Sequence, residues 1–110
     1  MKYHVQFKYR FELLVPLADN EGRPFPWSKI ERVGDSLIRR FGGCRCQPLA
    51  PHLGLWKHDG VIYREGLLLF TVDTPRSDES LDWMLDYQQR LKRQFHQLEI
   101  YVAVSELLWL

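Results

Sequence analysis

The sequence predicts a small α+β domain in which an antiparallel sheet carries two helices on one face. The chain has 110 residues, the usual length of one domain. Hydrophobic residues make up 45% of it and charged residues 26%, a composition typical of a folded globular protein. Segments with two-residue periodicity and segments with helical periodicity follow one another in the order strand, helix, strand, strand, helix, strand.

The N-terminal half contains a long strand and a helix. Every odd position of residues 3–15 is apolar and the even positions up to Glu12 are polar, which predicts a strand with one buried face that Pro16 ends. Ser28 and Glu31 fit a capping box, which predicts the start of a helix. The apolar stripe of this helix consists of Trp27, Ile30, Leu37, Ile38 and Phe41.

The C-terminal half contains a hairpin, a second helix and a last strand. A short strand is predicted from Cys44 to Leu49, and Asp59-Gly60 between two apolar segments predicts a hairpin turn that leads into a strand through Val72. Ser77-Asp78-Glu79 opens a helix, and a strand over residues 100–104 follows it. The apolar stripe of this second helix consists of Leu81, Met84, Leu85, Leu91 and Phe95.

This order of elements is the split βαβ arrangement of the ferredoxin-like fold. We expect one domain over residues 1–110, a βαββαβ sandwich with an antiparallel sheet and both helices on one face. Residues 103–110 are expected to form the end of the last strand and an apolar tail.

A series of glycine and aromatic residues resembles the pattern of a group of small uncharacterised bacterial ferredoxin-like proteins. The matching residues are Gly42-Gly43, Gly54-x-Trp56, Gly60 and Tyr63-x-Glu65. The resemblance extends from about Phe11 to Val104 and implies the same fold, without implying any catalytic residue. A threonine that often follows the Gly-Gly pair in that group is replaced here by Cys44 or Cys46.

Charge and cysteine content exclude several classes of protein. Fifteen Lys and Arg against fourteen Asp and Glu leave a net charge of +1, so the chain has no overall basic field for nucleic acid or membrane surfaces. Its apolar runs are much shorter than the roughly 20 residues of a membrane-spanning helix. Residues 1–8 lack the apolar core of a signal peptide, and two cysteines make no disulfide framework. We therefore expect a cytoplasmic protein without a cofactor.

Two cysteines and two histidines suggest a metal site. Cys44 and Cys46 would lie on one face of a strand, and His52 and His58 are the nearest candidates for two further zinc ligands. The Cys-x-Cys spacing differs from that of a zinc knuckle, and free cysteines are commonly small core hydrophobes. The favoured interpretation is therefore that no metal is bound.

An acid/base site is a second hypothesis. His58 and Asp59 could form a polar pair near Glu65, and histidine is the usual general base near neutral pH. His-Asp-Gly is also typical of a solvated turn. The sequence contains neither a Gly-x-Ser-x-Gly nor a His-Glu-x-x-His motif, so it favours a protein that is not an enzyme.

The polar face of the predicted sheet is a candidate surface for nucleic acid. Basic side chains there would contact phosphates and an aromatic ring would stack on a base, as in RNA-binding sheets of this architecture. The candidate residues are Lys8, Arg10, Arg45, Arg64 and Tyr101. The low net charge and the few aromatic residues argue against this function.

Large apolar residues outside the predicted core indicate a protein interface. Two aromatic residues lie off the main stripe of the second helix, and the C-terminal tail carries more apolar side chains than a small core can bury. The candidate residues are Trp83, Tyr87, Leu107, Leu108, Trp109 and Leu110. The alternative is a tail that folds back along the sheet of its own chain.

These observations favour a non-enzymatic interaction or assembly module, either a homodimer or the small subunit of a larger complex. Binding of RNA or single-stranded nucleic acid through the polar sheet face is the alternative. A third hypothesis is a small-molecule enzyme of the dimeric α/β-barrel type, with acid/base chemistry at His58, Asp59 and Glu65.

Overall fold

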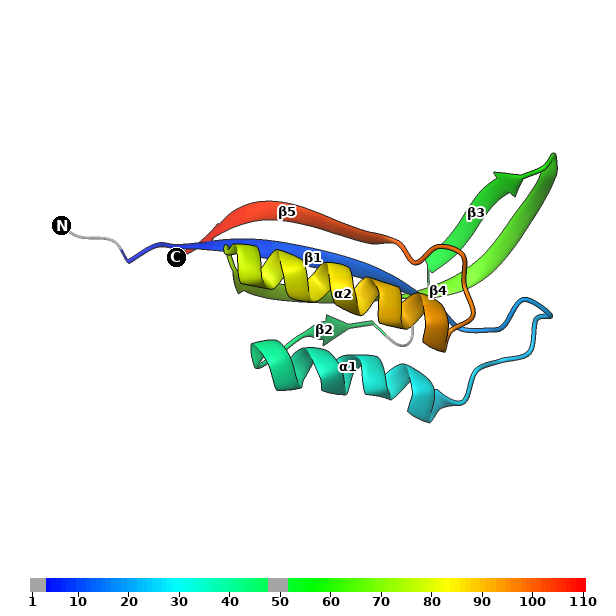
Figure 1. Ribbon diagram of the computed structural model, residues 1–110, viewed down its shortest axis with the longest axis horizontal. Helices are drawn as coiled ribbons and strands as arrows, with labels where there is room; N and C mark the ends of the chain where they lie inside the picture. The colour runs from blue at the N-terminus through cyan, green and yellow to red at the C-terminus, as the bar shows by residue number, and fades with distance from the viewer. Residues whose placement is uncertain (1–3, 48–51) are drawn as a thin grey trace.

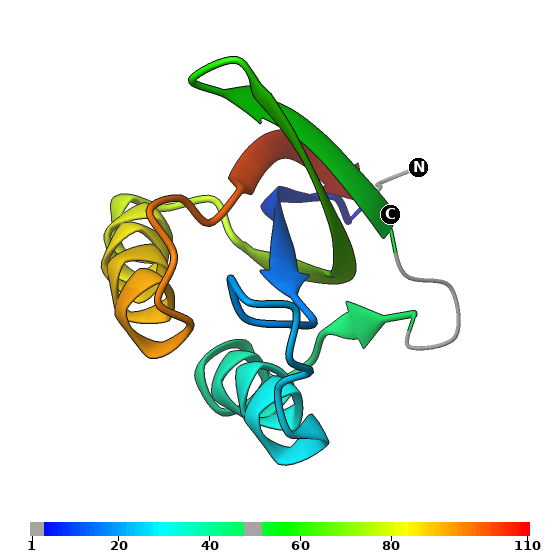
Figure 2. The ribbon, with the colours of Figure 1, turned by 90° about the vertical axis from the view of Figure 1, so that its right-hand side faces the viewer.

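The computed structural model describes residues 4–47 and 52–110 and confirms the predicted fold class. Two helices lie against one face of an antiparallel sheet (Figures 1 and 2). The elements in chain order are β1 (Gln6–Pro16), α1 (Trp27–Phe41), β2 (Arg45–Cys46), β3 (His52–His58), β4 (Val61–Pro75), α2 (Asp78–Gln94) and β5 (Val102–Trp109).

The order of strands is β2-β4-β1-β5, and β3 also pairs with β4. The second strand of the ferredoxin-like fold is therefore divided between β2 and β3. The pairing changes register between them, because Arg45 lies opposite Thr71 whereas His52 lies opposite Leu67. The strand predicted from Cys44 to Leu49 is shorter than expected, and residues 48 and 49 lie outside the described part of the chain.

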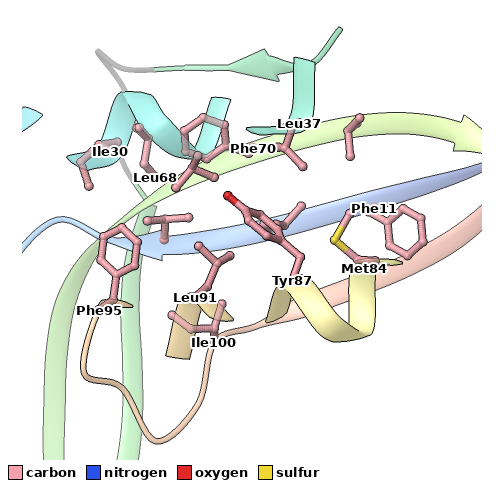
Figure 3. Close-up of a cluster of buried hydrophobic side chains, with 14 residues drawn as sticks. Phe11, Ile30, Leu37, Leu68, Phe70, Met84, Tyr87, Leu91, Phe95 and Ile100 are labelled. Carbon is pink, nitrogen blue, oxygen red and sulfur yellow. The ribbon is translucent and has the colours of Figure 1, made fainter. Parts of the chain in front are cut away.

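The hydrophobic core lies between the sheet and the two helices, and Figure 3 shows part of it. The odd positions of β1 point into it, as the alternation predicts: Phe11, Leu13 and Val15 are buried. Each of the two helices contributes the residues of its sheet-facing side to this core. The buried residues of these helices are Ile30, Val33, Leu37, Ser80, Met84, Tyr87 and Leu91.

Both predicted helix stripes need correction. Ile38 in α1 and Leu85 in α2 are exposed, whereas Tyr87 is only 3% exposed. In α2 the residues facing the sheet recur at positions 80, 84, 87 and 91, which is the spacing of one helix face, and Leu85 lies about 100° away from Met84.

The caps of the two helices also differ from each other. Helix α1 starts after Pro26 and no side chain caps it, so the capping box predicted at Ser28 and Glu31 is wrong. Pro26 has the extended backbone that a chain adopts before a helix begins, and its carbonyl accepts a hydrogen bond from the Lys29 amide at 2.9 Å. Helix α2 has the predicted cap, since the Ser77 hydroxyl accepts a hydrogen bond from the Ser80 amide.

Strand β5 is longer than the strand predicted over residues 100–104. It pairs with β1 from Leu13 opposite Val102 to Gln6 opposite Trp109. All but the last residue of the predicted apolar tail therefore belongs to the sheet, and the tail folds back within its own chain.

The molecule is elongated because one hairpin projects from the sandwich (Figure 1). Its radius of gyration is 15.5 Å, compared with about 13 Å for a compact domain of this length. The projecting hairpin consists of β3 and the first half of β4, residues 52–67, and we call it the arm. We call the sheet face opposite the helices the helix-free face.

Candidate functional site

The arm is held together by a tight turn and an aromatic pair. Asp59 and Gly60 both have positive φ angles, 49° and 79°, as a two-residue hairpin turn requires. Trp56 lies opposite Tyr63 in the register, and their rings stack with centroids 4.4 Å apart. Such a cross-strand pair contributes up to about 1 kcal/mol, so local contacts define the hairpin.

Replacing Gly60 by alanine is expected to loosen the arm and leave the sandwich intact. Placing a Cβ at a residue with φ of 79° costs about 1–2 kcal/mol. Hydrogen exchange measures this cost: amides of residues 53–64 should exchange faster, while those of β1 should keep their protection. Equal changes in the arm and in β1 would contradict this local effect.

Both faces of the arm carry exposed apolar side chains. Leu53, Leu55 and Ile62 lie on one face and are 67%, 62% and 67% exposed. Trp56, Val61 and Tyr63 lie on the other face and are 45%, 52% and 41% exposed. An isolated two-stranded hairpin is marginally stable in water, and grouped exposed apolar residues mark interaction surfaces.

The sequence analysis did not predict that the hairpin projects with exposed apolar faces, although a signal for it is present in the sequence. Alternation with period two breaks down at Leu55-Trp56 and again at Val61-Ile62-Tyr63, where apolar residues occupy neighbouring positions. Such runs are typical of strands covered on both faces. Here, among residues 4–47 and 52–110, these apolar side chains stay exposed on both faces.

The proposed acid/base residues do not form one site. His58 and Asp59 lie at the exposed end of the arm, where His58 Nε2 is 3.2 Å from an Asp59 carboxylate oxygen. Glu65 lies four residues farther along β4 than Val61, which is about 13 Å from the turn. Burial raises the pKa of the Glu65 carboxyl, and the neighbouring Trp56 side chain partly opposes this shift. The structure therefore places His58 next to Asp59, as the hypothesis expects, but separates this pair from Glu65 along the strand.

The two cysteines lie beside the core. Cys44 precedes β2 and Cys46 ends it, and both thiols are half-buried and free. Burial raises the pKa of both thiols, which lowers the fraction of reactive thiolate. Within residues 4–47 and 52–110, no three His, Cys, Asp or Glu residues are grouped closely enough to bind a metal ion.

Several polar residues gather on the helix-free face around Asp73. Arg10 donates two hydrogen bonds to the Asp73 carboxylate, at 2.7 and 2.8 Å, and the Trp109 indole donates a third at 3.0 Å. These bonds, Arg10 foremost, lower the pKa of the Asp73 carboxyl. The Lys8 ammonium lies over the Trp109 ring, 4.5 Å from its centroid.

Two shallow hollows adjoin this cluster and share Arg45 and Thr71. One, of about 380 Å³, extends to Asp73 and Trp109, and the other, of about 540 Å³, extends to Glu12 and Leu69. Arg45 lies across from Thr71 on β2.

Only part of the predicted nucleic-acid surface is assembled. Lys8, Arg10 and Arg45 share the helix-free face, but the Arg10 charge is paired with Asp73. Arg64 lies on the opposite face of β4, because successive residues of a strand alternate in direction. Tyr101 is exposed just before β5.

The predicted interface residues of α2 lie within the fold. Tyr87 belongs to the core, and its ring points from α2 into the cluster (Figure 3), so the prediction that it is an exposed interface residue is wrong. Trp83 is half-buried and stacks on Tyr87 with centroids 4.8 Å apart. Its other ring contact is Phe41, at 5.1 Å. These aromatic contacts stabilise the packing of α1 against α2.

The other predicted interface residues belong to β5 or follow it. Leu107 is half-buried, whereas Leu108, Trp109 and Leu110 are exposed. Leu107 and Leu108 pair with Lys8 and Phe7 of β1, so deleting residues 107–110 would remove sheet pairing as well as exposed apolar surface.

Comparisons with known proteins support the fold. No family model matches the chain, and no curated protein matches it. A phage SAM lyase in complex with S-methyl-5'-thioadenosine has a similar structure, with a TM-score of 0.70 and 12% identity over 96% of this chain and 86% of that chain. CutA from Synechococcus elongatus PCC7942 is also similar, with a TM-score of 0.64 and 13% identity over 96% of this chain and 85% of that chain. At such identities the likeness shows the ferredoxin-like fold alone.

A phage SAM lyase in its apo state is a third structural neighbour, with a TM-score of 0.62 and 14% identity over 96% of this chain and 86% of that chain. In the part of the chain that the structure describes, neither helix is long and apolar enough to cross a membrane.

Proposed function

We propose that this protein is a non-enzymatic assembly module that binds copies of itself through the arm. The observation that supports this proposal most directly is the exposure of large apolar side chains on both faces of a hairpin that projects from the sandwich. Their burial against another chain would contribute about 25 cal/mol for each Å² of apolar surface removed from water.

The shape of the molecule supports the same proposal. A hairpin that leaves its own sheet buries little surface in its own chain, yet the arm carries six of the exposed large hydrophobic residues. Aromatic residues such as Trp56 and Tyr63 are enriched at protein interfaces. A second copy of the chain would cover the arm without any further component. The two free thiols fit a reducing compartment, and we propose the cytoplasm as the location.

The triple variant Leu55→Ser, Trp56→Ser, Ile62→Ser is expected to be a monomer. It removes apolar surface from both faces of the arm, whereas the wild-type chain should have at least twice the chain mass of 13.2 kDa. Light scattering coupled to size-exclusion chromatography measures the mass, and circular dichroism checks the fold.

The matched control is Leu85→Ser with Leu98→Ser, which removes two exposed leucines outside the arm. This control should keep the wild-type mass. A wild-type chain that is monomeric up to about millimolar concentration, or a triple variant that still assembles, would overturn the proposal.

A further inference from the structure

The side chains on the helix-free face of β4 form a pattern of charged and apolar residues. This pattern is complementary to a second copy of itself that runs in the opposite direction. The outward residues of β4 from the arm to the centre of the sheet are Glu65, Leu67, Leu69 and Thr71. Arg45 lies beside Thr71 on β2, so the pattern reads acidic, apolar, apolar, basic. Leu67 and Leu69 are half-buried, and a second strand with the same pattern, running the opposite way, would place each charge opposite its counterpart.

We propose that the helix-free face binds the same face of a second copy about a two-fold axis beside Leu67 and Leu69, so that Glu65 of each copy pairs with Arg45 of the other. This inference rests on the proposed self-assembly and specifies its surface. A two-fold contact uses one surface patch on both copies, so that patch must be self-complementary.

The two charges needed for this contact interact only weakly with others in the described part of the chain: the Trp56 side chain favours the charged form of Glu65, and Arg45 contributes a little to the lowered pKa of Asp73. In residues 4–47 and 52–110, no ion pair includes Arg45 or Glu65. On the same face Arg10 binds Asp73, whereas Glu12, which lies across Thr71 from Arg45, forms no ion pair in the described residues. The half-buried Glu65 carboxyl has a raised pKa because burial disfavours its charged form, and a neighbouring cation would relieve this cost.

The dimensions of the sheet suit the contact. Six residues along β4 place Glu65 and Thr71 about 20 Å apart, so two ion pairs would flank the apolar centre at that spacing. Sheets that pack face to face lie about 10 Å apart, a distance that extended Arg and Glu side chains from two sheets span together. Two residues beyond Thr71, the Arg10–Asp73 pair would face the Trp56–Tyr63 stack of the other copy.

The arm lies on the helix-free side of the molecule (Figures 1 and 2), so its Trp56–Tyr63 face continues the surface proposed for the contact. In both ribbon views the arm bends away from the helices and rises on the helix-free side (Figures 1 and 2). In such a dimer the Trp56–Tyr63 face of each arm would lie over the end of β4 that carries Asp73 in the other copy. The arrangement would cover Trp56 and Tyr63 and leave the aliphatic face of the arm outside.

Charge reversal tests this pairing. Glu65→Arg and Arg45→Glu are each expected to raise the dimer dissociation constant at least about tenfold, because each places like charges together at two symmetric positions. The combined variant Glu65→Arg, Arg45→Glu should return to within about threefold of the wild-type constant, because the pairs form again with opposite polarity. Sedimentation equilibrium over a dilution series measures all four constants.

Arg64→Glu is the matched control, since Arg64 is adjacent to Glu65 but lies on the other face of β4. It should change the constant less than about threefold. Single variants without effect, or a combined variant weaker than either single one, would overturn the inference. If the arm triple variant is monomeric while charge reversal has no effect, the assembly function stands and this surface is wrong. A monomeric wild-type chain would overturn both.

Discussion

Replacing Tyr87 by alanine is expected to lower the free energy of unfolding by about 3–5 kcal/mol, the usual cost of truncating a buried aromatic residue. The Tyr87 ring is almost fully buried, stacks on Trp83 and lies below the Arg90 guanidinium, which is 5.0 Å from its centroid. The substitution would leave a cavity between the two helices and the sheet. Urea unfolding measured by circular dichroism determines the change.

Leu85→Ala provides a matched control on the same helix. Leu85 is 61% exposed, so its truncation should change the free energy of unfolding by less than about 0.5 kcal/mol. Equal effects at Tyr87 and Leu85 would contradict the packing described for α2. A Tyr87→Ala variant that loses assembly but keeps its stability would instead restore Tyr87 as an interface residue.

Replacing Asp73 by asparagine is expected to lower the free energy of unfolding by about 1–3 kcal/mol at pH 7. The substitution removes the charge that accepts hydrogen bonds from Arg10 and Trp109, and these bonds connect β4 across β1 to the end of β5. The lower half of the range is favoured, because the Arg10 side chain is 34% exposed and solvent weakens the ion pair.

The pH dependence of the same variant tests the cause. The folded-state pKa of the Asp73 carboxyl is lowered, mainly by the Arg10 hydrogen bond, from an unfolded value of about 3.9. Its contribution to stability is therefore complete above about pH 5 and is lost as the pH falls through the folded pKa. Urea unfolding at several pH values should show the difference between wild type and Asp73→Asn shrinking below about pH 4.

Asp35→Asn, at an exposed position on α1, serves as the control for this series. It should change stability little at any pH. A difference between wild type and Asp73→Asn that stays constant down to pH 2 would show that the stabilisation does not depend on the Asp73 charge.

The fold was predictable from the sequence because its strongest signals are local. Alternation along β1, the Asp59-Gly60 turn and the Ser77 cap each specify one element through contacts within a few residues. The order of these elements then limits the topology to a few arrangements. Errors arose where the helix face was chosen by apolarity alone, as at Leu85, because a tyrosine with a large apolar ring filled that part of the core instead.

The candidate site was less predictable because it depends on how far the β3–β4 hairpin extends beyond the part of the sheet that the helices cover. The sequence indicates that β3 and β4 form a hairpin, but it does not show that residues 52–67 extend past both helices. The sequence therefore did not show that the first half of β4 is exposed on both faces whereas the second half is buried on one face. Arg64 was grouped with Lys8 although the register places them on opposite faces, since the strand parity of the second half was unknown until pairing fixed it.

The pairing of β1 with β5 has a consequence for the order of folding. Gln6 and Trp109, which lie opposite each other, are separated by about a hundred residues of chain, and β1 meets β4 across about sixty. Contacts over such separations form slowly, whereas a hairpin with a two-residue turn closes within microseconds. We therefore expect the arm to form first, as a marginally stable hairpin with its apolar faces exposed, before the central strand has either neighbour. Under the proposed self-assembly, chains would meet through the arm while they are still folding, so the protein concentration during folding would influence whether they meet before their cores have closed.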